Sequence, residues 1–434
     1  MDESVPKAVD LRGAGLVPSE PSAAEPSSLE DLQRRALSTP NPLVPSTYGS
    51  GPDWCYRLRV VLCGVVLVPI RLPIFLLCCL VASLFAKVAV IGIPLQETNA
   101  QPLSRWRKAM VFVVRAMNRG ALWALGVVWI RIKGRPAPRS KAPIIVSNHH
   151  GFLDAPFVYV FVPYVSFVSA EEHLHIPVLS ALVRAAQTIT VKRTNPESRQ
   201  RAKAQIIRYA TSPEPMPQVC IFPEGTVTNG RAVISFKVGA FEPMVPVQPL
   251  VLRYPHRALD PTWVYGNPSL PVLIFALMAS PITRLEAEFL EPIAPSPADG
   301  GLPDRFARRV QTYMAEQLGG VPVTEHTAED TALQGAAMAL GLPAHAGVLE
   351  MGALRRVYGA DRYLAKAAAK EFVRLAGRGV ERLTLSAWLA GLASAGDPAA
   401  KAGASSSRGG ASQPPRLRDE LWGVYARLGK DEGE

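Results

Sequence analysis

The sequence predicts an α/β protein with a mixed or parallel sheet flanked by helices, preceded by membrane-embedded helices and followed by a small helical region. Between residues 142 and 291, short runs rich in β-branched residues alternate with helical segments. That alternation is typical of a sheet covered by helices, with active loops at the strand ends. A long apolar stretch precedes these runs at residues 57–95, and an alanine-rich helical pattern follows Thr324.

The composition favours a membrane surface or a phosphate-bearing substrate. Hydrophobic residues make up 48% of the 434 residues and charged residues 19%, whereas soluble domains average about 25% charged residues. The net charge is +11 and the pI about 9.5, which suits anionic lipid or phosphate. No zinc-finger, homeodomain or RNA-binding signature accompanies this charge, so we expect no nucleic-acid partner. The five cysteines match neither a zinc site nor a disulfide framework.

Composition also divides the chain into six parts. Residues 1–50 are rich in Pro, Ser, Ala and acidic residues, which predicts a disordered tail. Residues 393–415 are rich in Gly, Ala and Ser, which predicts a flexible linker. The predicted parts are a tail at 1–50, membrane-associated helices at 51–135, a catalytic domain at 136–324, a helical region at 325–392, a linker at 393–415 and a last helix at 416–434.

The most apolar stretch of the chain, residues 57–95, contains two prolines and two basic residues in its interior. Its first part, 60–70, is too short to span a bilayer, and 72–95 is long enough if a lysine near its end reaches an interface. Two arrangements stay open: a short interfacial helix followed by a spanning helix, or a hairpin that enters and leaves one leaflet. Both place a bend near 69–73. A soluble helix pair is less expected, and two arginines before the stretch favour the cytosolic side.

Further elements follow in order. Residues 103–135 predict an amphipathic helix, at an interface or against the core, and then a strand. The apolar run at 270–280 is too short to span, and fits either a dip into the membrane or a core helix. Strands are predicted at 143–147, 164–169, 188–192, 218–222 and 245–253, and helices at 176–186, 198–211 and 304–318.

The segment "SNHHGFLD", residues 147–154, follows an apolar strand and carries a histidine and an aspartate five residues apart. A turn or helix start between them brings the Asp154 carboxylate back to the His149 imidazole. That contact fixes the tautomer and raises the basicity of the other ring nitrogen. His149 is therefore a candidate general base, although the octapeptide alone equally fits a structural His–Asp pair.

Three further motifs carry candidate binding residues. In "CIFPEGTVTNG", residues 220–230, Glu224 can bind hydroxyls, Gly225 permits close backbone approach and Thr226 can bind phosphate. In "TITVKRTNPESRQ", Arg193 ends a β-type run and can bind phosphate through two N–H groups. The fourth motif, "VPVQPLVLRY", has prolines that suit the start or the edge of a strand. Each motif alone also fits an ordinary strand boundary.

Together the four motifs resemble the glycerophospholipid acyltransferase (PlsC-like) family, in the order and at the separations of that family. The segments "VKRTNPESRQ", "FPEGTVTNGRAVISFKVGAFEPMVPVQPLVLRY" and "MAEQLGGVPVTEHTAEDTAL" are similar to the lysophosphatidylcholine and lysophosphatidylethanolamine acyltransferase branch. The resemblance covers roughly residues 55–330 and implies the glycerolipid acyltransferase fold. His150 stands where many relatives carry a small polar residue.

The resemblance implies transfer of an acyl group from acyl-CoA to a lysophospholipid hydroxyl. His149 would be the base and Asp154 would orient it. Arg193, Glu224, Gly225 and Thr226 would hold the glycerol and phosphate, with Lys237 in "SFKVGAF" as an additional phosphate contact. No acyl-enzyme is required, and no cysteine takes the place of a nucleophile in the four motifs. The branch works in the endoplasmic reticulum membrane, so the resemblance implies that location, with the active site facing the cytosol.

The C-terminal region departs from that branch, whose members often carry EF-hands. Residues 376–392 fit a degenerate, ligand-poor hand, and no complete calcium loop with a closing glutamate is present. We therefore expect no cofactor and no calcium dependence, with acyl-CoA as co-substrate. Three rivals stay open: a lysophosphatidic acid acyltransferase, a metallohydrolase built on the two adjacent histidines, and a catalytically silent membrane scaffold.

Overall fold

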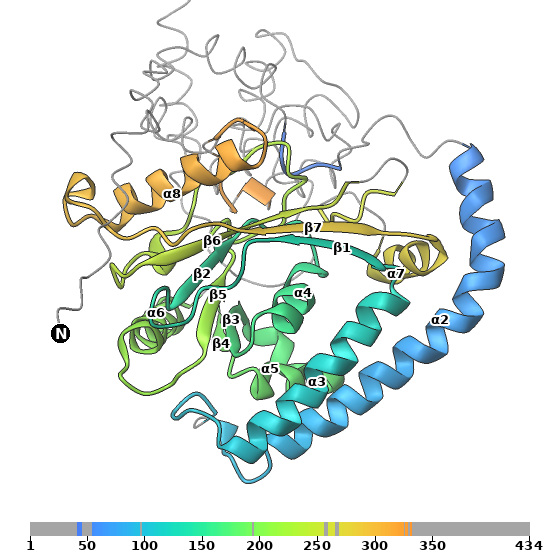
Figure 1. Cartoon of the computed structure of the whole chain (residues 1–434), viewed down its shortest axis with the longest axis horizontal. Helices are drawn as coiled ribbons and strands as arrows, with labels where there is room; N and C mark the ends of the chain where they lie inside the picture. The colour runs from blue at the N-terminus through green and yellow to red at the C-terminus, as the bar shows by residue number, and fades with distance from the viewer. Residues whose placement is uncertain are drawn as a thin grey trace, which may run out of the picture.

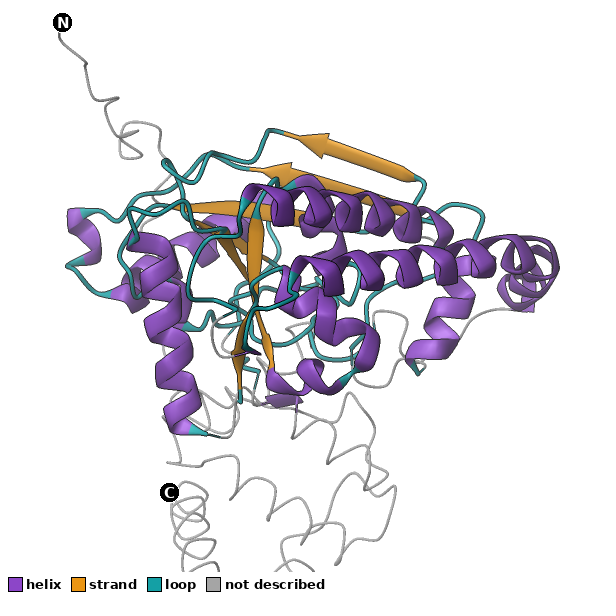
Figure 2. Cartoon of the chain, turned by 90° about the horizontal axis from the view of Figure 1, so that it is seen from below, coloured by secondary structure: helices purple, strands orange, loops and turns teal. Residues whose placement is uncertain are grey.

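A mixed β-sheet forms the centre of the molecule, with helices on both sides (Figures 1 and 2). The computed structural model describes residues 41–45, 54–95, 98–192, 195–255, 259–264, 269–324, 326–328 and 330–331. The predictions for the tail before residue 41, for the EF-hand-like region beyond residue 331, for the linker and for the last helix lie outside the described residues.

Seven strands make up this sheet in the described part of the chain, in the order β1-β7-β6-β2-β5-β3-β4. All neighbouring strands are parallel except β6 and β7, which are antiparallel. The predicted mixed α/β sheet is thereby confirmed. The strands are β1 (Trp129–Lys133), β2 (Ile144–Ser147), β3 (Val165–Ala170), β4 (Ile189–Val191), β5 (Gln218–Ile221), β6 (Val247–Arg253) and β7 (Arg284–Phe289).

Two hydrophobic cores cover the two faces of the sheet. Because successive strand residues point to opposite faces, Ile145 of β2 belongs to one core, and Ile144 and Val146 belong to the other. The first core includes residues of α3, α4, α5 and α7, and the second includes residues of α6 and α8. The helices are α3 (Arg105–Ala124), α4 (Asp154–Phe161), α5 (Pro177–Ala185), α6 (Pro196–Thr211), α7 (Leu270–Ala279) and α8 (Pro303–Gln317).

The apolar stretch forms one helix, α2 (Trp54–Ala89), which passes through both Pro69 and Pro73. The stretch is therefore not divided into two helices at 69–73, as both predicted arrangements require, although Figure 1 shows that α2 bends along its length. A proline removes one backbone hydrogen bond and kinks a helix, and a packed helix tolerates this when its neighbours support it. The chain reverses its direction after α2, and the next long helix, α3, packs along α2 (Figure 1).

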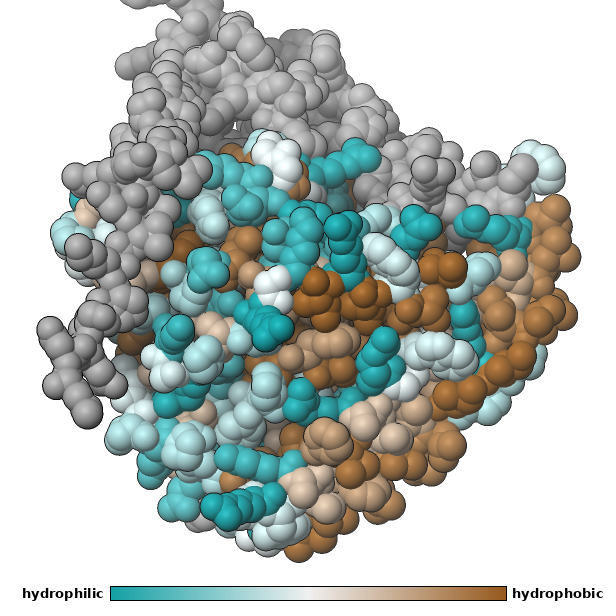
Figure 3. Space-filling view, viewed as in Figure 1, coloured by the Kyte–Doolittle hydropathy of each residue, from teal (hydrophilic) through white to brown (hydrophobic). Residues whose placement is uncertain are grey.

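The inward face of α2 carries small side chains and its outward face carries large ones. Within the range 58–89, this helix is long and apolar enough to cross a membrane by length and composition. Large exposed side chains give the outer side of α2 a continuous apolar surface, which forms the brown edge in Figure 3. A surface helix of a soluble protein instead turns its apolar side chains to the core and polar or charged ones to solvent. The buried positions are Gly64, Arg71, Cys78, Ala82, Ser83, Ala86 and Ala89.

Arg71 is the one cation on this inward face of the described helix. Its Nη1 donates to the carbonyl oxygens of Met278 and Ser280, at 2.8 and 2.5 Å, and Nη2 donates to Pro281 O at 3.0 Å. These carbonyls lie at the C-terminal end of α7, where a helix exposes unpaired acceptors and partial negative charge. Arg71 thus joins α2 to α7.

Helices α3 and α7 share their side chains between the core and the surface. In α3, Val111 and Val114 are buried while Phe112 is exposed. In α7, Leu277 is buried while Phe275 is exposed. Each helix therefore serves as a core helix on one side and continues the apolar surface of α2 on the other.

The end of the predicted disordered tail differs from expectation. Residues 41–45 form a turn against the loop after β5, and Leu43 is only 1% exposed. Local composition predicts disorder here, but contacts with residues 185 to 188 positions away hold the segment.

Candidate active site

The register of the sheet brings the histidine motif and the glutamate motif together. Val146 of β2 is level with Ile221 of β5. Residues 149 and 224, each three positions further along, therefore lie side by side just beyond the same edge of the sheet. The His149 backbone N–H donates to Glu224 Oε1 at 3.2 Å. The two motifs, far apart in sequence, therefore form one site at the carboxyl edge of the parallel strands, where α/β folds place their active loops.

His149 and Asp154 form a dyad as their spacing predicts. His149 Nδ1 lies 2.7 Å from Asp154 Oδ2, and α4 begins at Asp154. The same oxygen accepts the backbone N–H groups of His150, at 2.6 Å, and Gly151, at 2.8 Å. The tight turn between strand and helix thus wraps around one carboxylate oxygen.

The other carboxylate oxygen is held from a different strand. Tyr254, which follows β6, donates its hydroxyl to Asp154 Oδ1 at 2.5 Å. Burial alone would raise the pKa of Asp154. The hydrogen bond from His149, the nearby charges of His149 and His150 and the Tyr254 hydroxyl together hold that pKa below its usual value. Asp154 therefore stays ionised and orients the imidazole.

The imidazole of His149 is fixed by stacking as well as by hydrogen bonding. Its ring lies 4.2 Å from the Phe222 ring at an interplanar angle of 21°. The side chain is 24% exposed. Because Asp154 occupies Nδ1, the nitrogen left for a substrate is Nε2, which is the arrangement that a general base requires.

His150, the neighbour of His149 in the sequence, is held by contacts within the protein. Its Nε2 lies 2.7 Å from Asn148 Nδ2 and 3.1 Å from Leu252 O, and its Nδ1 lies 3.3 Å from Thr228 O. Both ring nitrogens therefore have protein partners. Among the described residues, no group of three or more His, Cys, Asp or Glu side chains could hold a metal ion.

Glu224 is a buried carboxyl beside the dyad, 1% exposed. Burial raises its pKa to about 8, because the Thr228 hydroxyl and the His149 N–H beside it only partly offset the lost solvation. Within the described part of the chain, Glu224 Oε2 accepts no hydrogen bond that meets normal geometry. A protonated carboxyl with one oxygen unengaged at neutral pH can donate to a substrate oxygen.

The remaining predicted site residues lie around this carboxyl. Gly225 has a φ of +69°, which favours glycine, and a Cβ there would meet Lys237 Cε at 2.6 Å. The exposed Lys237 thus passes over Gly225. Thr226 accepts the Thr331 hydroxyl at 3.2 Å. The structure therefore groups Glu224, Gly225, Thr226 and Lys237 beside the dyad.

Arg193 lies outside the described residues. The strand before it, β4, ends at Val191 on the edge of the sheet and pairs with β3 in parallel. Lys192, the next residue, is exposed, and its backbone N–H donates to Ser198 Oγ at 2.9 Å.

Sequence reasoning missed Tyr254 as a site residue, and one signal could have found it. The tyrosine ends the motif "VPVQPLVLRY", and the strand in that motif, β6, pairs in parallel with β2. A residue just past the end of β6 therefore reaches the edge where His149 leaves β2. Finding it requires the strand order, which a single sequence does not supply.

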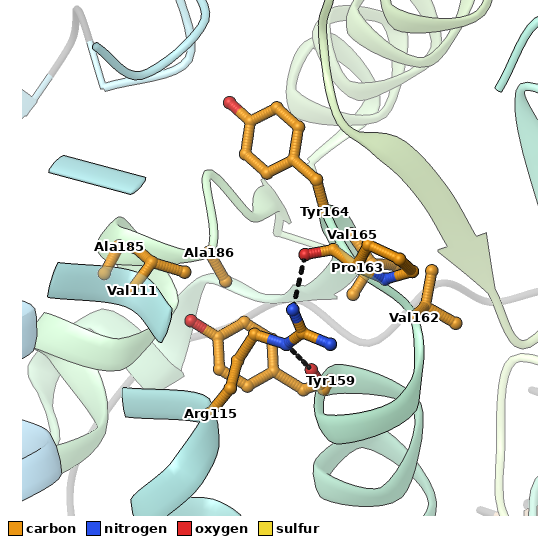
Figure 4. A pocket seen from close by; sticks show the side chains of 9 residues that line it. All are labelled: Val111, Arg115, Tyr159, Val162, Pro163, Tyr164, Val165, Ala185 and Ala186. Atoms are coloured by element: carbon orange, nitrogen blue, oxygen red, sulfur yellow. Dashed lines mark hydrogen bonds between the residues drawn. The ribbon is translucent and has the colours of Figure 1, made fainter. Parts of the chain in front are cut away.

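A small hollow between α3, α4 and α5 is occupied by a structural arginine (Figure 4). Arg115 donates to the carbonyls of Tyr159, Val160 and Pro163 at 2.7 to 3.0 Å, at the end of α4. Its guanidinium is thereby used as a helix cap.

The geometry defines a class of protein: an α/β protein that holds a histidine against an ionised aspartate and carries an extensive apolar surface. Comparisons with known proteins agree with this class. The family model "Acyltransferase" matches residues 129–253. Human lysophosphatidylcholine acyltransferase 2 is 35% identical over 73% of this chain, and zebrafish lysophosphatidylcholine acyltransferase 1 is 36% identical over 70%.

Residues 129–253 match the acyltransferase family, and the chain is similar to its lysophosphatidylcholine acyltransferase branch. It spans 57% of the human relative and 58% of the zebrafish relative. A crystal structure of the 1-acyl-sn-glycerophosphate acyltransferase PlsC from Thermotoga maritima is also similar, with 21% identity and a TM-score of 0.37 over 57% of this chain and 98% of that one.

Proposed function

We propose that the protein is an acyl-CoA-dependent lysophospholipid acyltransferase that converts lysophosphatidylcholine, lysophosphatidylethanolamine or both to the diacyl lipid. The observation that carries the proposal is the dyad: Asp154 holds His149 Nδ1 at 2.7 Å and leaves Nε2 for a substrate hydroxyl. The names of the relatives support the lysophospholipid acceptor.

In the proposed reaction, His149 Nε2 takes the proton of the lysophospholipid hydroxyl as that oxygen attacks the thioester carbonyl of acyl-CoA. An ester C–O bond forms and the C–S bond breaks. The proton on His149 then passes to the leaving CoA sulfur, which restores the neutral base. Asp154 stabilises the imidazolium formed on the way. No acyl-enzyme forms, and the buried Cys220 supports this, because burial raises the pKa of its thiol.

Around the dyad, Glu224, Gly225 and Thr226 would hold the glycerol and phosphate, with Lys237 and Arg193 as cationic contacts. Their grouping beside His149 supports the first four assignments. A protonated Glu224 can donate to a phosphate or hydroxyl oxygen. No metal or other cofactor takes part in this proposal, and acyl-CoA acts as co-substrate.

The apolar surface formed by α2, α3 and α7 would bring the site to a bilayer. Because α2 packs lengthwise on α3, α5 and α7, we place it within the headgroup and acyl region of one leaflet and not across both. Exposed side chains of α7, such as Phe275, continue the surface. The proposed location is the endoplasmic reticulum membrane, with the active site on the cytosolic side.

The proposal is tested by an acyl-transfer assay on membranes that contain the protein. Labelled oleoyl-CoA is offered with each of several lysophospholipids, and His149→Ala is compared with wild type at equal expression. Loss of the general base should lower the rate on the order of a hundredfold or more. His150→Ala is not a suitable control, because His150 packs against the site.

The outcomes separate the rival functions. A choline or ethanolamine product that depends on His149 supports the proposal and identifies the head group. Product from lysophosphatidic acid alone would assign the sister activity. An activity that chelators remove would favour a metallohydrolase. Well-expressed protein with no His149-dependent product on any acceptor would favour the scaffold.

A further inference from the structure

The last residues of the glutamate motif form a loop that binds a segment 185 to 188 positions earlier in the sequence. Asn229 donates its backbone N–H to Pro42 O at 2.8 Å, and its side-chain Nδ2 donates to Asn41 O and Val44 O, each at 2.8 Å. The segment is closed into a turn by Leu43 N, which donates to Asn41 Oδ1 at 2.9 Å. We name residues 41–45 the clasp.

The clasp is buried and its recognition by the loop is specific. Leu43 is 1% exposed and Val44 is 8% exposed. Asn229 itself is 8% exposed, and its Oδ1 accepts Arg231 N at 2.9 Å. The loop therefore presents three N–H donors in a fixed arrangement, and a buried donor without an acceptor is costly. The turn formed by the clasp supplies three carbonyl oxygens that accept from these donors, and its buried leucine adds apolar packing.

The residue before Asn229 connects this contact to the dyad. Thr228 N donates to His149 O at 2.8 Å, and Thr228 O lies 3.3 Å from His150 Nδ1. The Thr228 hydroxyl also lies beside Glu224. A Cβ at Gly230 would meet His150 Cε1 at 2.3 Å. The residues on both sides of Asn229 thus contact the turn that carries His149 and His150. A movement of Asn229 would therefore disturb the hydrogen bond from Thr228 N to His149 O.

We infer that the clasp is an interaction partner of the active-site loop and that Asn229 is a positioning residue for the dyad. Binding of residues 41–45 fixes residues 228–230, which in turn hold His149 and Glu224 in register. Release of the clasp leaves the donors of Asn229 without their acceptors and loosens the loop. The effect on catalysis rests on the proposed function, whereas the effect on the loop does not.

The test uses the full chain and two readouts. Leu43→Asp expels the clasp by placing a charge in a buried position, and Asn229→Ala removes two of the three donors. Leu43→Met is the conservative rescue. Asn99→Ala is the matched control, because Asn99 Nδ2 also donates to a backbone carbonyl, that of Thr188 at 3.0 Å, away from the site. The readouts are steady-state acyl transfer and amide hydrogen exchange in residues 223–236.

We expect Leu43→Asp and Asn229→Ala each to lower kcat about tenfold or more while KM for the lysophospholipid changes less than about threefold. The double variant should lose no more than the worse single variant, because both substitutions break one contact. Exchange in residues 223–236 should rise in both variants while exchange in α8 stays at the wild-type level, which shows an intact fold. Asn99→Ala should keep kcat within about twofold of wild type.

Two results would overturn the inference. Unchanged loop exchange in Leu43→Asp would show that the clasp does not hold the loop. Raised loop exchange with an unchanged kcat would show that the clasp holds the loop without positioning the dyad. A wild-type protein with no acyl transfer on any acceptor would refute the proposed function, and the exchange readout would still decide whether the clasp holds the loop.

Discussion

At the scale of single residues, the site is built around one saturated carboxylate. Asp154 accepts from His149, from two backbone N–H groups of the turn and from Tyr254. Charge-assisted hydrogen bonds of this kind are strong, and several of them keep a buried carboxylate ionised. The orientation of His149 therefore depends on a donor that lies on a strand other than its own.

Tyr254→Phe tests this dependence. The loss of one hydrogen bond to a charged group costs about 1.5–3 kcal/mol, which corresponds to about one to two pKa units. The pKa of Asp154 is held low, so the ionised dyad persists as the pH falls. Without the Tyr254 hydroxyl, Asp154 gains its proton at a higher pH. We expect the acidic fall of kcat, which reports protonation of the His149–Asp154 dyad as a unit, to move to higher pH in the variant.

The control for that measurement is Tyr164→Phe. Tyr164 is a partly buried tyrosine whose hydroxyl also donates to a side-chain oxygen, Gln187 Oε1 at 2.5 Å, away from the dyad. Its removal should leave the shape of the pH profile unchanged. Tyr254→Phe and wild-type profiles that superimpose after scaling would contradict a role for Tyr254 in the dyad.

Residue patterns predicted one half of the site better than the other. The His149–Asp154 contact is local, because a turn of five residues closes it, and the spacing alone predicted it. The contact with Tyr254 joins residues 100 positions apart and depends on β6 lying beside β2. No local pattern contains that information, so the tyrosine was missed.

At the scale of secondary structure, the type of each element was more predictable than its interruptions. Every predicted strand of the catalytic domain is present, because short runs of apolar and β-branched residues between turn signals give a strong local signal. Two prolines four residues apart predicted a bend between two separate helices in the apolar stretch, yet α2 continues through both prolines as one helix. Packing of α2 on α3, α5 and α7 outweighs the local cost of each proline.

Arg71 shows what supports that helix. The sequence presents it as an interruption of an apolar run, whereas the structure uses it to cap α7. Replacement by methionine keeps the length of the side chain and removes every donor. Because buried carbonyls then lose a charged partner, we expect a loss of about 2–4 kcal/mol, which lowers Tm in detergent by about 3–8 °C.

Lys87→Met is the matched control for Arg71→Met. Lys87 lies in the last turn of the same helix and is exposed, so its replacement removes a cation without breaking a buried contact. Its Tm should stay within about 2 °C of wild type. Equal Tm values for the two variants would show that the contacts of Arg71 with α7 do not stabilise the protein.

At the scale of the whole molecule, polar and apolar surfaces are separated. In Figure 3, apolar side chains gather along the edge formed by α2, and hydrophilic side chains dominate the opposite side. The site lies at the sheet edge, on a domain that is fixed to this apolar edge through α3 and α7. Substrates with long acyl chains reside in a bilayer, so this arrangement suits a site that takes them from the membrane surface.

The apolar edge makes a quantitative prediction about membrane binding. Leu77 and Leu84 of α2 are 60% and 57% exposed, and burial of a leucine side chain in an apolar phase contributes about 1.5–3 kcal/mol. The double variant Leu77→Lys, Leu84→Lys should therefore bind neutral vesicles at least about tenfold more weakly in a flotation assay. Leu302→Lys is the control, because Leu302 is 45% exposed at the start of α8, a helix that packs on the face of the sheet opposite to α2.

Vesicles of neutral phosphatidylcholine are essential to this comparison. On anionic vesicles the added lysines would gain about 1 kcal/mol each from the surface charge and mask the loss. The double variant should also keep the Tm of the wild type in detergent, because both leucines point away from the core. If it floats with neutral vesicles as well as Leu302→Lys does, the outer face of α2 is not the surface that meets the bilayer, and the membrane contact must lie on another part of the chain.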